Sequence, residues 1–573
     1  MAKRPFLLKK QPLVAARRLA QTIPPKTQWQ YNEPEVDVDD IQGDAFLGFN
    51  KPHLAILAID IADDTTAATN TKKWLTDYVI PYVTTARDVI QFRDMFRMMR
   101  EIRGGIKPMT VAEVCFNVSF SYDALLKLAP VAEVKTFYQS THVAFKIGLP
   151  YRSPILQDPL SGEGANTNWV VGKGTNPHIL IQIASDRTCL IQEEIDRLQS
   201  GLATLGNPAT ITYQEYGKRR HDLYGHEHFG FLDGISNMGL RGTYTEQGTD
   251  TQMYITPRFL HDTDTRKDLY GLPGQLLVWP GEVILGLPKQ YQNTTGDAAD
   301  PSQPGETSFI GPEWAKNGTY LVYRRLKQDV PKFWKFMKDS ADKISKQPGM
   351  TGFTKEHMGA KVISRWQSGT PIIRKPHKDN PELGSDRLAN NAFQYVSDQA
   401  PFKCKPDGQT DKFPLGKPDV PGMVCPLASH LRKVQPRDAG TDIGSSLDTL
   451  KHVVIRRGIE YGDPIEDVMV DDGKDRGLMF VAYQANIDKQ FEFLITHWAN
   501  SDTNPHDGGG HDMVIGQAGN DSDTGVRKPR VFDVPTEDGT IQLRTADEWV
   551  IPTGGGYFFV PSISALTNVI AKI

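Results

Sequence analysis

A predicted strand followed by an amphipathic helix occurs four times in this sequence, and no other feature limits the fold as strongly. In the first half, residues 114–129 (VCFNVSFSYDALLKLA) and 178–202 (HILIQIASDRTCLIQEEIDRLQSGL) each begin with a strand-like apolar run and continue with apolar residues at helical spacing. Residues 318–338 (GTYLVYRRLKQDVPKFWKFMK) and 477–500 (GLMFVAYQANIDKQFEFLITHWAN) repeat this arrangement. We interpret the chain as an internally duplicated α+β unit.

The duplication favours two ferredoxin-like domains with antiparallel β-sheets over one doubly wound parallel sheet. No glycine-rich dinucleotide turn follows any of the predicted strands. We predict a flexible basic N-terminal arm (1–40), an N-terminal domain (41–245), a long connecting loop region (246–317) and a C-terminal domain (318–573). Segments 246–317, 367–425 and 500–530 are rich in Gly, Pro, Asp, Asn and Thr, which predicts long loops.

The overall charge and the cysteine content give little reason to expect a macromolecular partner or an oxidising compartment. A net charge of −4 provides no electrostatic reason to bind nucleic acid or an anionic membrane. The 4 cysteines lie far apart, without a CxxC pair, and no apolar run reaches the length of a membrane helix. The first 32 residues hold seven Lys/Arg and no acid, but no apolar segment follows Arg17-Arg18 as a signal peptide requires. We predict a cytoplasmic protein, and leave homo-oligomerisation open.

The stretch HFGFLDGISN, residues 228–237, places one carboxylate among glycines and large apolar residues. Gly230 and Gly234 allow a tight backbone that points the short side chain of Asp233 in a fixed direction. The apolar neighbours predict a desolvated carboxylate that serves as a proton acceptor. An Asp-Gly pair also suits an ordinary Asx-turn, so this stretch alone does not decide between the two interpretations.

Two further stretches hold candidate functional residues. In CPLASHLRKVQPRD, residues 425–438, His430 stands between an apolar and a basic stretch, and a single histidine of this kind serves either as a ligand or as a structural residue. In HVVIRRGIEYGD, residues 452–463, Arg456 ends a β-branched run and points either into a cavity or into a surface ion pair.

Taken together and in order, these motifs resemble the dye-decolorizing peroxidase family. GFLDGISN, CPLASHLRKVQPRD, IRRGIEYG, GLMFVAYQANIDKQFEFLITHWAN and a closing GGGYFFVPS follow one another, and the similarity extends from DIQG near residue 40 to the C-terminus. Arg456 is followed by Arg457 and Gly458, so the distal asparagine of some bacterial relatives is absent. The chain therefore resembles the longer, fungal-like (class V-like) group of the family.

The resemblance implies a haem b enzyme of the dimeric α+β barrel type, with the haem in a cavity of the C-terminal half. It implies that His430 is the axial ligand of the haem iron, with Asp512 as its carboxylate partner, since a carboxylate orients a metal-bound imidazole. A plain loop aspartate at position 512 remains an alternative. Leu478 and Phe480 match apolar residues that restrict access to the iron, although core residues look the same.

The resemblance also implies a peroxidase mechanism. Hydrogen peroxide loses a proton from one oxygen and gains one on the other, a transfer suited to ionised Asp233 beside the permanent charge of Arg456. The oxidising power, held as a ferryl haem, then leaves in one-electron steps to dyes, phenols or other aromatic donors. Tyr461 and Trp498 match surface aromatic residues that transfer electrons in relatives, and they also suit ordinary packing.

Two other functions compete with this interpretation. A haem protein for carriage or iron release, as in a deferrochelatase, needs haem but no distal acid and cation. A zinc hydrolase using His221, His226 and His228 has a plausible metal-binding spacing but lacks the HExxH pattern. An interaction scaffold built on the long loops has no motif to support it.

Overall fold

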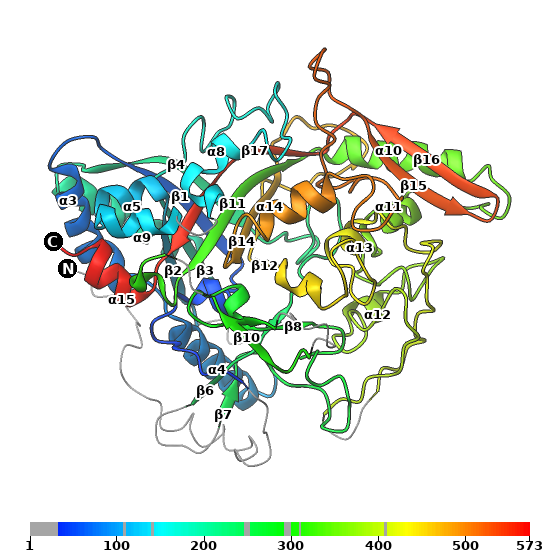
Figure 1. Ribbon diagram of the computed structural model, residues 1–573, viewed down its shortest axis with the longest axis horizontal. Helices are drawn as coiled ribbons and strands as arrows, with labels where there is room; N and C mark the ends of the chain where they lie inside the picture. The colour runs from blue at the N-terminus through cyan, green and yellow to red at the C-terminus, as the bar shows by residue number, and fades with distance from the viewer. Residues whose placement is uncertain are drawn as a thin grey trace.

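One closed antiparallel sheet organises the molecule (Figure 1). The structure, a computed structural model, describes residues 33–106, 111–138, 142–245, 252–291, 300–308, 311–405 and 410–573. Within these ranges the strand order is β11 (Thr319–Gln328), β17 (Val550–Val560), β2 (Val114–Phe120), β3 (Ile179–Ser185), β1 (His53–Ile61), β4 (Ala209–Lys218), β13 (Ile459–Tyr461), β14 (Gly477–Gln484), β12 (Ile455–Arg456). An additional pairing of β11 with β14 closes this sheet into a barrel.

The two halves of the chain contribute equivalent sets of strands. Read from its fourth strand, the first half has the order β4-β1-β3-β2 and the second half has β17-β11-β14-β13. In each half the strands therefore lie in the ferredoxin-like order 4-1-3-2, numbered along that half of the chain. The halves join where Phe559 of β17 pairs with Phe120 of β2, and where Tyr461 of β13 pairs with Gly217 of β4. The predicted α+β fold with two ferredoxin-like units is confirmed, and its two sheets merge into one barrel.

All four predicted strand-to-helix units are present. The helices that follow β2, β3, β11 and β14 are α5 (Tyr122–Leu128), α9 (Thr188–Thr204), α10 (Val330–Ile344) and α14 (Phe491–Phe493), which continues as the π-helix η9 (Leu494–Ala499). Helix α10 begins where the Asp329 side chain accepts the N–H of Lys332, an N-cap contact that satisfies a donor left free by the first turn. Its buried apolar stripe, which includes Phe333 and Met337, then holds the helix against the body.

The remaining elements are short or cover the barrel. The other helices are α2 (Gly43–Phe46), α3 (Ala67–Trp74), α4 (Ala86–Ile102), α6 (Val131–Val134), α7 (Val143–Ile147), α8 (Leu149–Arg152), α11 (Lys355–Ile363), α12 (Pro381–Ser385), α13 (His430–Val434) and α15 (Ile563–Ala565). The 3-10 and π segments are η3 (Leu75–Val79), η4 (Ile80–Tyr82), η5 (Lys135–Tyr138), η6 (Pro280–Glu282), η7 (Glu313–Ala315), η8 (Asp448–Lys451) and η10 (Leu566–Ile570). The two-stranded sheets are β5 (Gly239–Leu240) with β8 (Leu277–Val278), β6 (Thr243–Thr245) with β7 (Gln252–Tyr254), β9 (Pro288–Gln290) with β10 (Pro304–Thr307), and β15 (Arg530–Thr536) with β16 (Gly539–Thr545).

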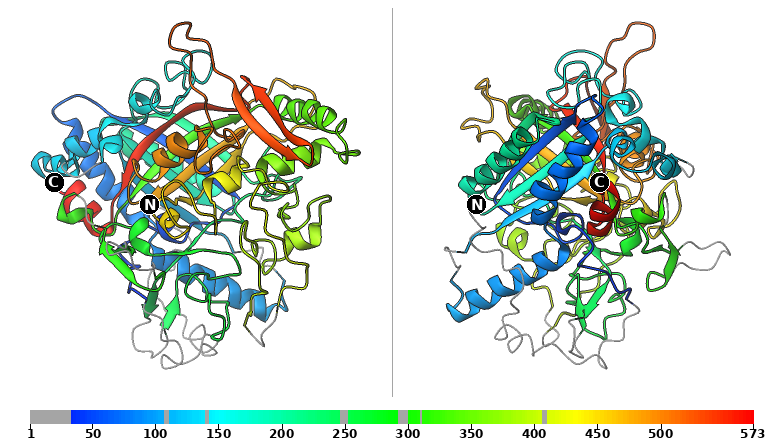
Figure 2. Two further views of the ribbon diagram at one scale, coloured as in Figure 1. Left: turned by 45° about the vertical axis from the view of Figure 1, so that its right-hand side comes forward. Right: turned by 90° about the vertical axis from the view of Figure 1, so that its left-hand side faces the viewer.

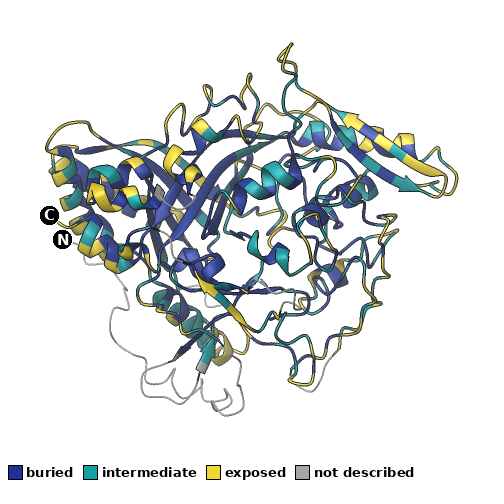
Figure 3. Cartoon of the chain, viewed as in Figure 1, coloured by how far each residue is buried: buried dark blue, intermediate teal, exposed yellow. Residues whose placement is uncertain are grey.

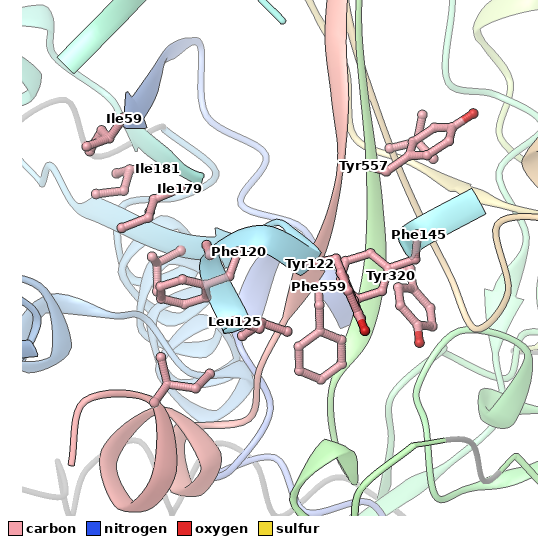
Figure 4. Packing of buried hydrophobic residues seen from close by; sticks show 14 of the residues in the cluster. Ile59, Phe120, Tyr122, Leu125, Phe145, Ile179, Ile181, Tyr320, Tyr557 and Phe559 are labelled. Atoms are coloured by element: carbon pink, nitrogen blue, oxygen red, sulfur yellow. The ribbon is translucent and has the colours of Figure 1, made fainter. Parts of the chain in front are cut away.

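Alternation along the strands divides the core into two layers. On β1, Ile56 belongs to the cluster inside the barrel, whereas Leu57 and Ile59 belong to the cluster outside it. Strands β1, β3 and β17 are buried along almost their whole length, whereas β4 is largely exposed or half-buried (Figure 3). Part of the outer cluster, including Tyr320 and Phe559, is shown in Figure 4. Helices α3, α5 and α9 cover one side of the barrel, and α10, α11 and α13 lie on the opposite side (Figures 1 and 2).

The predicted domain limits at 41–245, 246–317 and 318–573 remain predictions. Most of the predicted N-terminal arm, residues 1–32, lies outside the described residues. The next residues are packed, since Val36 and Val38 are buried and the Val36 N–H donates to the Thr243 carbonyl. Among the described residues, no helix is long and apolar enough to cross a membrane.

Candidate active site

His430 is the first residue of helix α13, and its neighbours fix that helix firmly. The preceding Ser429 is fully buried and donates its hydroxyl to the Lys361 carbonyl of α11. Arg432, two residues after His430, ties the helix to the preceding loop. Its guanidinium donates to the Cys425 carbonyl at 2.7 Å and lies over the ring of Tyr395. The imidazole therefore projects from a rigid support.

The imidazole of His430 is oriented by a buried carboxylate. Nδ1 of His430 lies 2.7 Å from Oδ2 of Asp512, which has no exposed surface. Oδ1 of Asp512 accepts the N–H groups of Val514 and Ile515 at 2.8 and 3.1 Å. Burial acts to raise the pKa of Asp512, but His430 and these N–H groups outweigh it and hold the pKa below its usual value. An ionised Asp512 fixes the proton of His430 on Nδ1 and leaves Nε2 available to a metal.

Asp233 lies on the loop between β4 and β5, in the conformation that its glycines allow. Gly230 and Gly234 have φ of 94° and 80°, in the region that favours glycine. The Gly234 N–H donates to Oδ1 of Asp233 at 2.6 Å. The rings of Phe229 and Phe231 stack on Phe333 and Trp334 of α10 and anchor the loop. The expectation of a desolvated carboxylate agrees with burial being the largest influence on the pKa of Asp233.

Arg456 approaches Asp233 from the end of β12. Its Nη1 lies 3.2 Å from Oδ1 of Asp233. The side chain of Asn237, not singled out from the sequence as a functional residue, donates to the Arg456 carbonyl at 3.1 Å and accepts the Arg456 N–H at 3.3 Å. These two bonds hold the GFLDGISN loop against β12. Its place in that motif was the only sequence signal for Asn237, because its partner is 219 residues away.

The side chains of His430, Arg456 and Asp233 are each partly accessible to solvent. His430, Arg456 and Asp233 have side-chain exposures of 22%, 32% and 38%. Burial is nevertheless the largest influence on the pKa of Asp233, and acts to raise it; Arg456, the Gly234 N–H and His430 outweigh burial and keep the pKa below its usual value. The ionised form of Asp233 is therefore favoured, with Arg456 as its ion-pair partner.

Strand β14 presents apolar side chains on the face of the sheet that carries Arg456. Side chains alternate along this strand: Leu478 and Phe480 are partly exposed on one face. Met479 and Val481 point to the other face and have no exposed surface. Arg456 pairs with Ala482 of β14, so it shares a face of the sheet with Leu478 and Phe480. The structure therefore pairs His430 with Asp512 and Asp233 with Arg456, and places Leu478 and Phe480 on the same face of the sheet as Arg456.

Tyr461 and Trp498 do not lie at the surface as expected. Tyr461 is 2% exposed, beneath Arg325, whose guanidinium carbon is 4.1 Å from the ring centroid. Trp498 has no exposed surface and donates its indole N–H to Asp442 at 3.1 Å. Tyr461 occurs on the strand face that points into the barrel, a direction that sequence spacing alone does not define.

The histidines of HDLYGHEHFG do not form a zinc site. His228 is buried, with Nε2 2.8 Å from the Tyr461 carbonyl, whereas His221 is exposed. Across the ranges that the structure describes, no group of three His, Cys, Asp or Glu side chains is arranged to hold a metal ion. The zinc hydrolase interpretation therefore has no support from the geometry.

The sequence matches the N-terminal and C-terminal domain models of one family. Residues 40–221 match the DyP dimeric alpha+beta barrel domain, and residues 292–507 match the C-terminal part of Dyp-type peroxidases. A dye-decolorizing peroxidase of Mycena epipterygia is 30% identical over 553 residues, which cover 94% of this chain and 87% of the relative. Peroxidase 2 of Mycetinis scorodonius is 29% identical over 554 residues, covering 94% and 88%.

Solved structures agree in fold over the same extent. An ancestral D-type dye-decolorizing peroxidase has a TM-score of 0.67 at 28% identity, covering 94% of this chain and all of the other. The enzyme of Auricularia auricula-judae has a TM-score of 0.65 at 26% identity, with the same coverage. With the barrel and both family matches, these relatives establish that the chain belongs to the dye-decolorizing peroxidase family.

Proposed function

We propose that this haem peroxidase binds haem b through His430, activates hydrogen peroxide with Asp233 and Arg456, and oxidises dyes and phenolic compounds. Two contacts carry the proposal. Asp512 holds Nδ1 of His430 at 2.7 Å, and Arg456 contacts Asp233 at 3.2 Å. His430 also lowers the pKa of Asp233, so the two pairs lie within electrostatic reach of each other, which supports one haem site for both.

The residues present fit a haem group. Nε2 of His430 makes no hydrogen bond within the described part of the chain, although Nδ1 is fully committed to Asp512. The exposed edges of Leu478 and Phe480 offer the apolar contact that a porphyrin face needs. His430 would bind the iron and these two side chains would contact the ring. Bound there, haem would supply the redox chemistry for oxidising aromatic donors with peroxide.

Asp233 performs the proton transfer. Its lowered pKa keeps the carboxylate ionised and able to accept a proton from one oxygen of hydrogen peroxide. Returning that proton to the other oxygen lets it depart as water, so the carboxylate is regenerated. Arg456 holds a positive charge 3.2 Å from Asp233 and stabilises the negative charge that develops as the O–O bond breaks.

The electron donors are aromatic molecules. A dye-decolorizing peroxidase that is 28% identical to this chain has been solved in complex with 2,6-dimethoxyphenol, which supports phenols as donors. For donors too large to enter the interior, Tyr461 and Trp498 would act as buried relays of the electron rather than as contact sites, since they are 2% and 0% exposed. The Tyr461 hydroxyl donates to Asp475 over 3.3 Å, and the Trp498 indole N–H donates to Asp442 over 3.1 Å. Each carboxylate can accept the proton that its partner releases on oxidation.

Substituting Asp233 with asparagine tests the proposal. The variant keeps the size of the side chain but cannot accept the peroxide proton, so the second-order rate constant for reaction with peroxide should fall by about 100-fold or more. Haem content should not change, because Asp233 does not contact His430. An unchanged rate constant at full haem content would exclude the role of Asp233. Haem carriage or iron release alone would leave the Asp233–Arg456 pair without a use.

A further inference from the structure

Asp233 is carried by a tight hairpin, residues 225–233, that the proposed mechanism leaves unexplained. The Asp233 N–H donates to the Gly225 carbonyl at 3.0 Å, and the Glu227 N–H donates to the Phe231 carbonyl at 3.1 Å. Between these bonds His226 and Leu232 form an antiparallel bridge. The position of the Asp233 carboxylate therefore depends on the shape of this hairpin.

The Glu227 side chain folds back into the turn of the hairpin. Its Oε2 accepts the Phe229 N–H at 2.8 Å, and its Oε1 accepts the Phe231 N–H at 2.8 Å. Oε2 also accepts the amide of Gln328 at 2.5 Å. Gln328 is the last residue of β11 and is 7% exposed, so it belongs to the barrel wall. One carboxylate thus links two N–H groups of the turn to a rigid strand.

The hydrogen bonds from Phe229, Phe231 and Gln328 stabilise the carboxylate against its burial. Burial raises the pKa of Glu227 to about 7, and the like charge of Asp233 adds to that effect. Only a side chain with two acceptor oxygens can bind both backbone N–H groups and Gln328 together. Glutamine has one acceptor oxygen, and its amide would face an N–H donor.

We propose that Glu227 and Gln328 are positioning residues. They hold the hairpin so that the Asp233 carboxylate stays beside Arg456, in the place from which it accepts the proton of hydrogen peroxide. This inference rests on the proposed role of Asp233. Glu227 does not contact the reacting atoms and acts through the backbone of Phe229 and Phe231. A shift of the hairpin would move the Asp233 carboxylate, and misplacement of a catalytic group by about 1 Å costs about 100-fold in rate.

The test compares holoenzyme variants at two buried glutamates. Glu282 is a matched control: it is 3% exposed, accepts the Gln290 N–H at 3.0 Å, and has a pKa raised to about 7 by burial, but makes no contact with the hairpin. Glu227→Ala, Glu227→Gln and Gln328→Ala are measured beside Glu282→Ala and Glu282→Gln. The readouts are the rate constant with peroxide, the rate of reduction by a phenolic donor, haem content, and amide hydrogen exchange at Phe229 and Phe231.

We expect the peroxide rate constant to fall by about 100-fold in Glu227→Ala and by about 10-fold in Glu227→Gln and Gln328→Ala. Exchange at Phe229 and Phe231 should quicken by about 10-fold or more, while donor reduction and haem content stay unchanged. The Glu282 variants should keep the rate constant within about twofold. The inference is overturned if Glu227→Ala retains the rate constant, or if the Glu282 variants lose as much. Asp233→Asn, run in parallel, separates the cases: loss there but not in the Glu227 variants defeats only the positioning role.

Discussion

Replacing Asp512 with asparagine removes the negative charge behind His430 and forces a choice between two poor arrangements. If the asparagine oxygen keeps the N–H groups of Val514 and Ile515, its amide faces Nδ1 of His430. Nδ1 must then accept a hydrogen bond, and the imidazole proton moves to Nε2, the nitrogen that the iron needs. In the other arrangement the amide faces two buried N–H donors, at a cost of about 1–3 kcal/mol each. The first arrangement should therefore prevail.

The size of the effect follows from the bond that is lost. A hydrogen bond to a buried charged group contributes about 1.5–3 kcal/mol, and each 1.4 kcal/mol is about tenfold in affinity. The Asp512 carboxylate has no exposed surface, so solvent does not weaken the contact at 2.7 Å. We therefore expect the affinity for haem to fall by about 10- to 100-fold, the range typical of a lost carboxylate partner of a metal-bound histidine.

The assay is the transfer of haem to an excess of a haem-free acceptor protein, followed by absorbance. Asp44→Asn is the control, because Asp44 is 4% exposed and accepts the Phe49 N–H at 3.1 Å and the Tyr483 hydroxyl at 2.6 Å without contacting a histidine. Asp512→Asn should release haem faster by about 10-fold or more, whereas Asp44→Asn should match the parent protein. Equal release rates in all three proteins would refute the reasoning.

Three further changes have defined outcomes. Arg456→Leu removes the charge that outweighs burial at Asp233, so the pKa of Asp233 should rise and the acid limb of the pH profile for the peroxide reaction should move to higher pH; an unmoved limb contradicts this. Burial lowers the pKa of His142 to about 4. Between about pH 6.5 and pH 4 the imidazole is therefore protonated in the unfolded chain but neutral in the folded chain, so the folded state loses stability as the pH falls through this range. His142→Phe should therefore gain about 2 kcal/mol in unfolding free energy relative to the parent between pH 7.5 and pH 5, measured with urea. The double variant Tyr461→Phe, Trp498→Phe should oxidise bulky dyes about tenfold more slowly or worse, with an unchanged peroxide rate constant; unchanged dye oxidation removes both residues from electron transfer.

The repeated units and their strands could be predicted because they are written in local patterns. Runs such as 178–184 are apolar and end at a helix with apolar residues every three or four positions, and β3 with α9 follows that pattern closely. The merging of the two sheets could not be predicted in the same way. It depends on contacts such as Phe120 with Phe559, which are distant in the sequence and involve strands that are apolar on both faces.

The site was found by resemblance to a family, and the structure explains why spacing alone was insufficient. His430 and Asp512 are 82 residues apart, and Arg456 and Asp233 are 223 apart, so no local pattern pairs them. The glycines beside Asp233 were informative, since their positive φ is a local requirement. The burial of Tyr461 was missed because the direction of a strand side chain depends on the register of the whole barrel.

Binding of iron by His430 is the central claim, and the spectrum of a His430→Ala variant tests it most directly. The parent protein, purified with haem, should show an intense Soret band and the electron paramagnetic resonance signal of ferric haem with one imidazole ligand. His430→Ala should lose the haem or change that signal, and added imidazole should restore it. A variant that retains haem with an unaltered signal, or a parent that stays colourless when supplied with haem, would contradict the account.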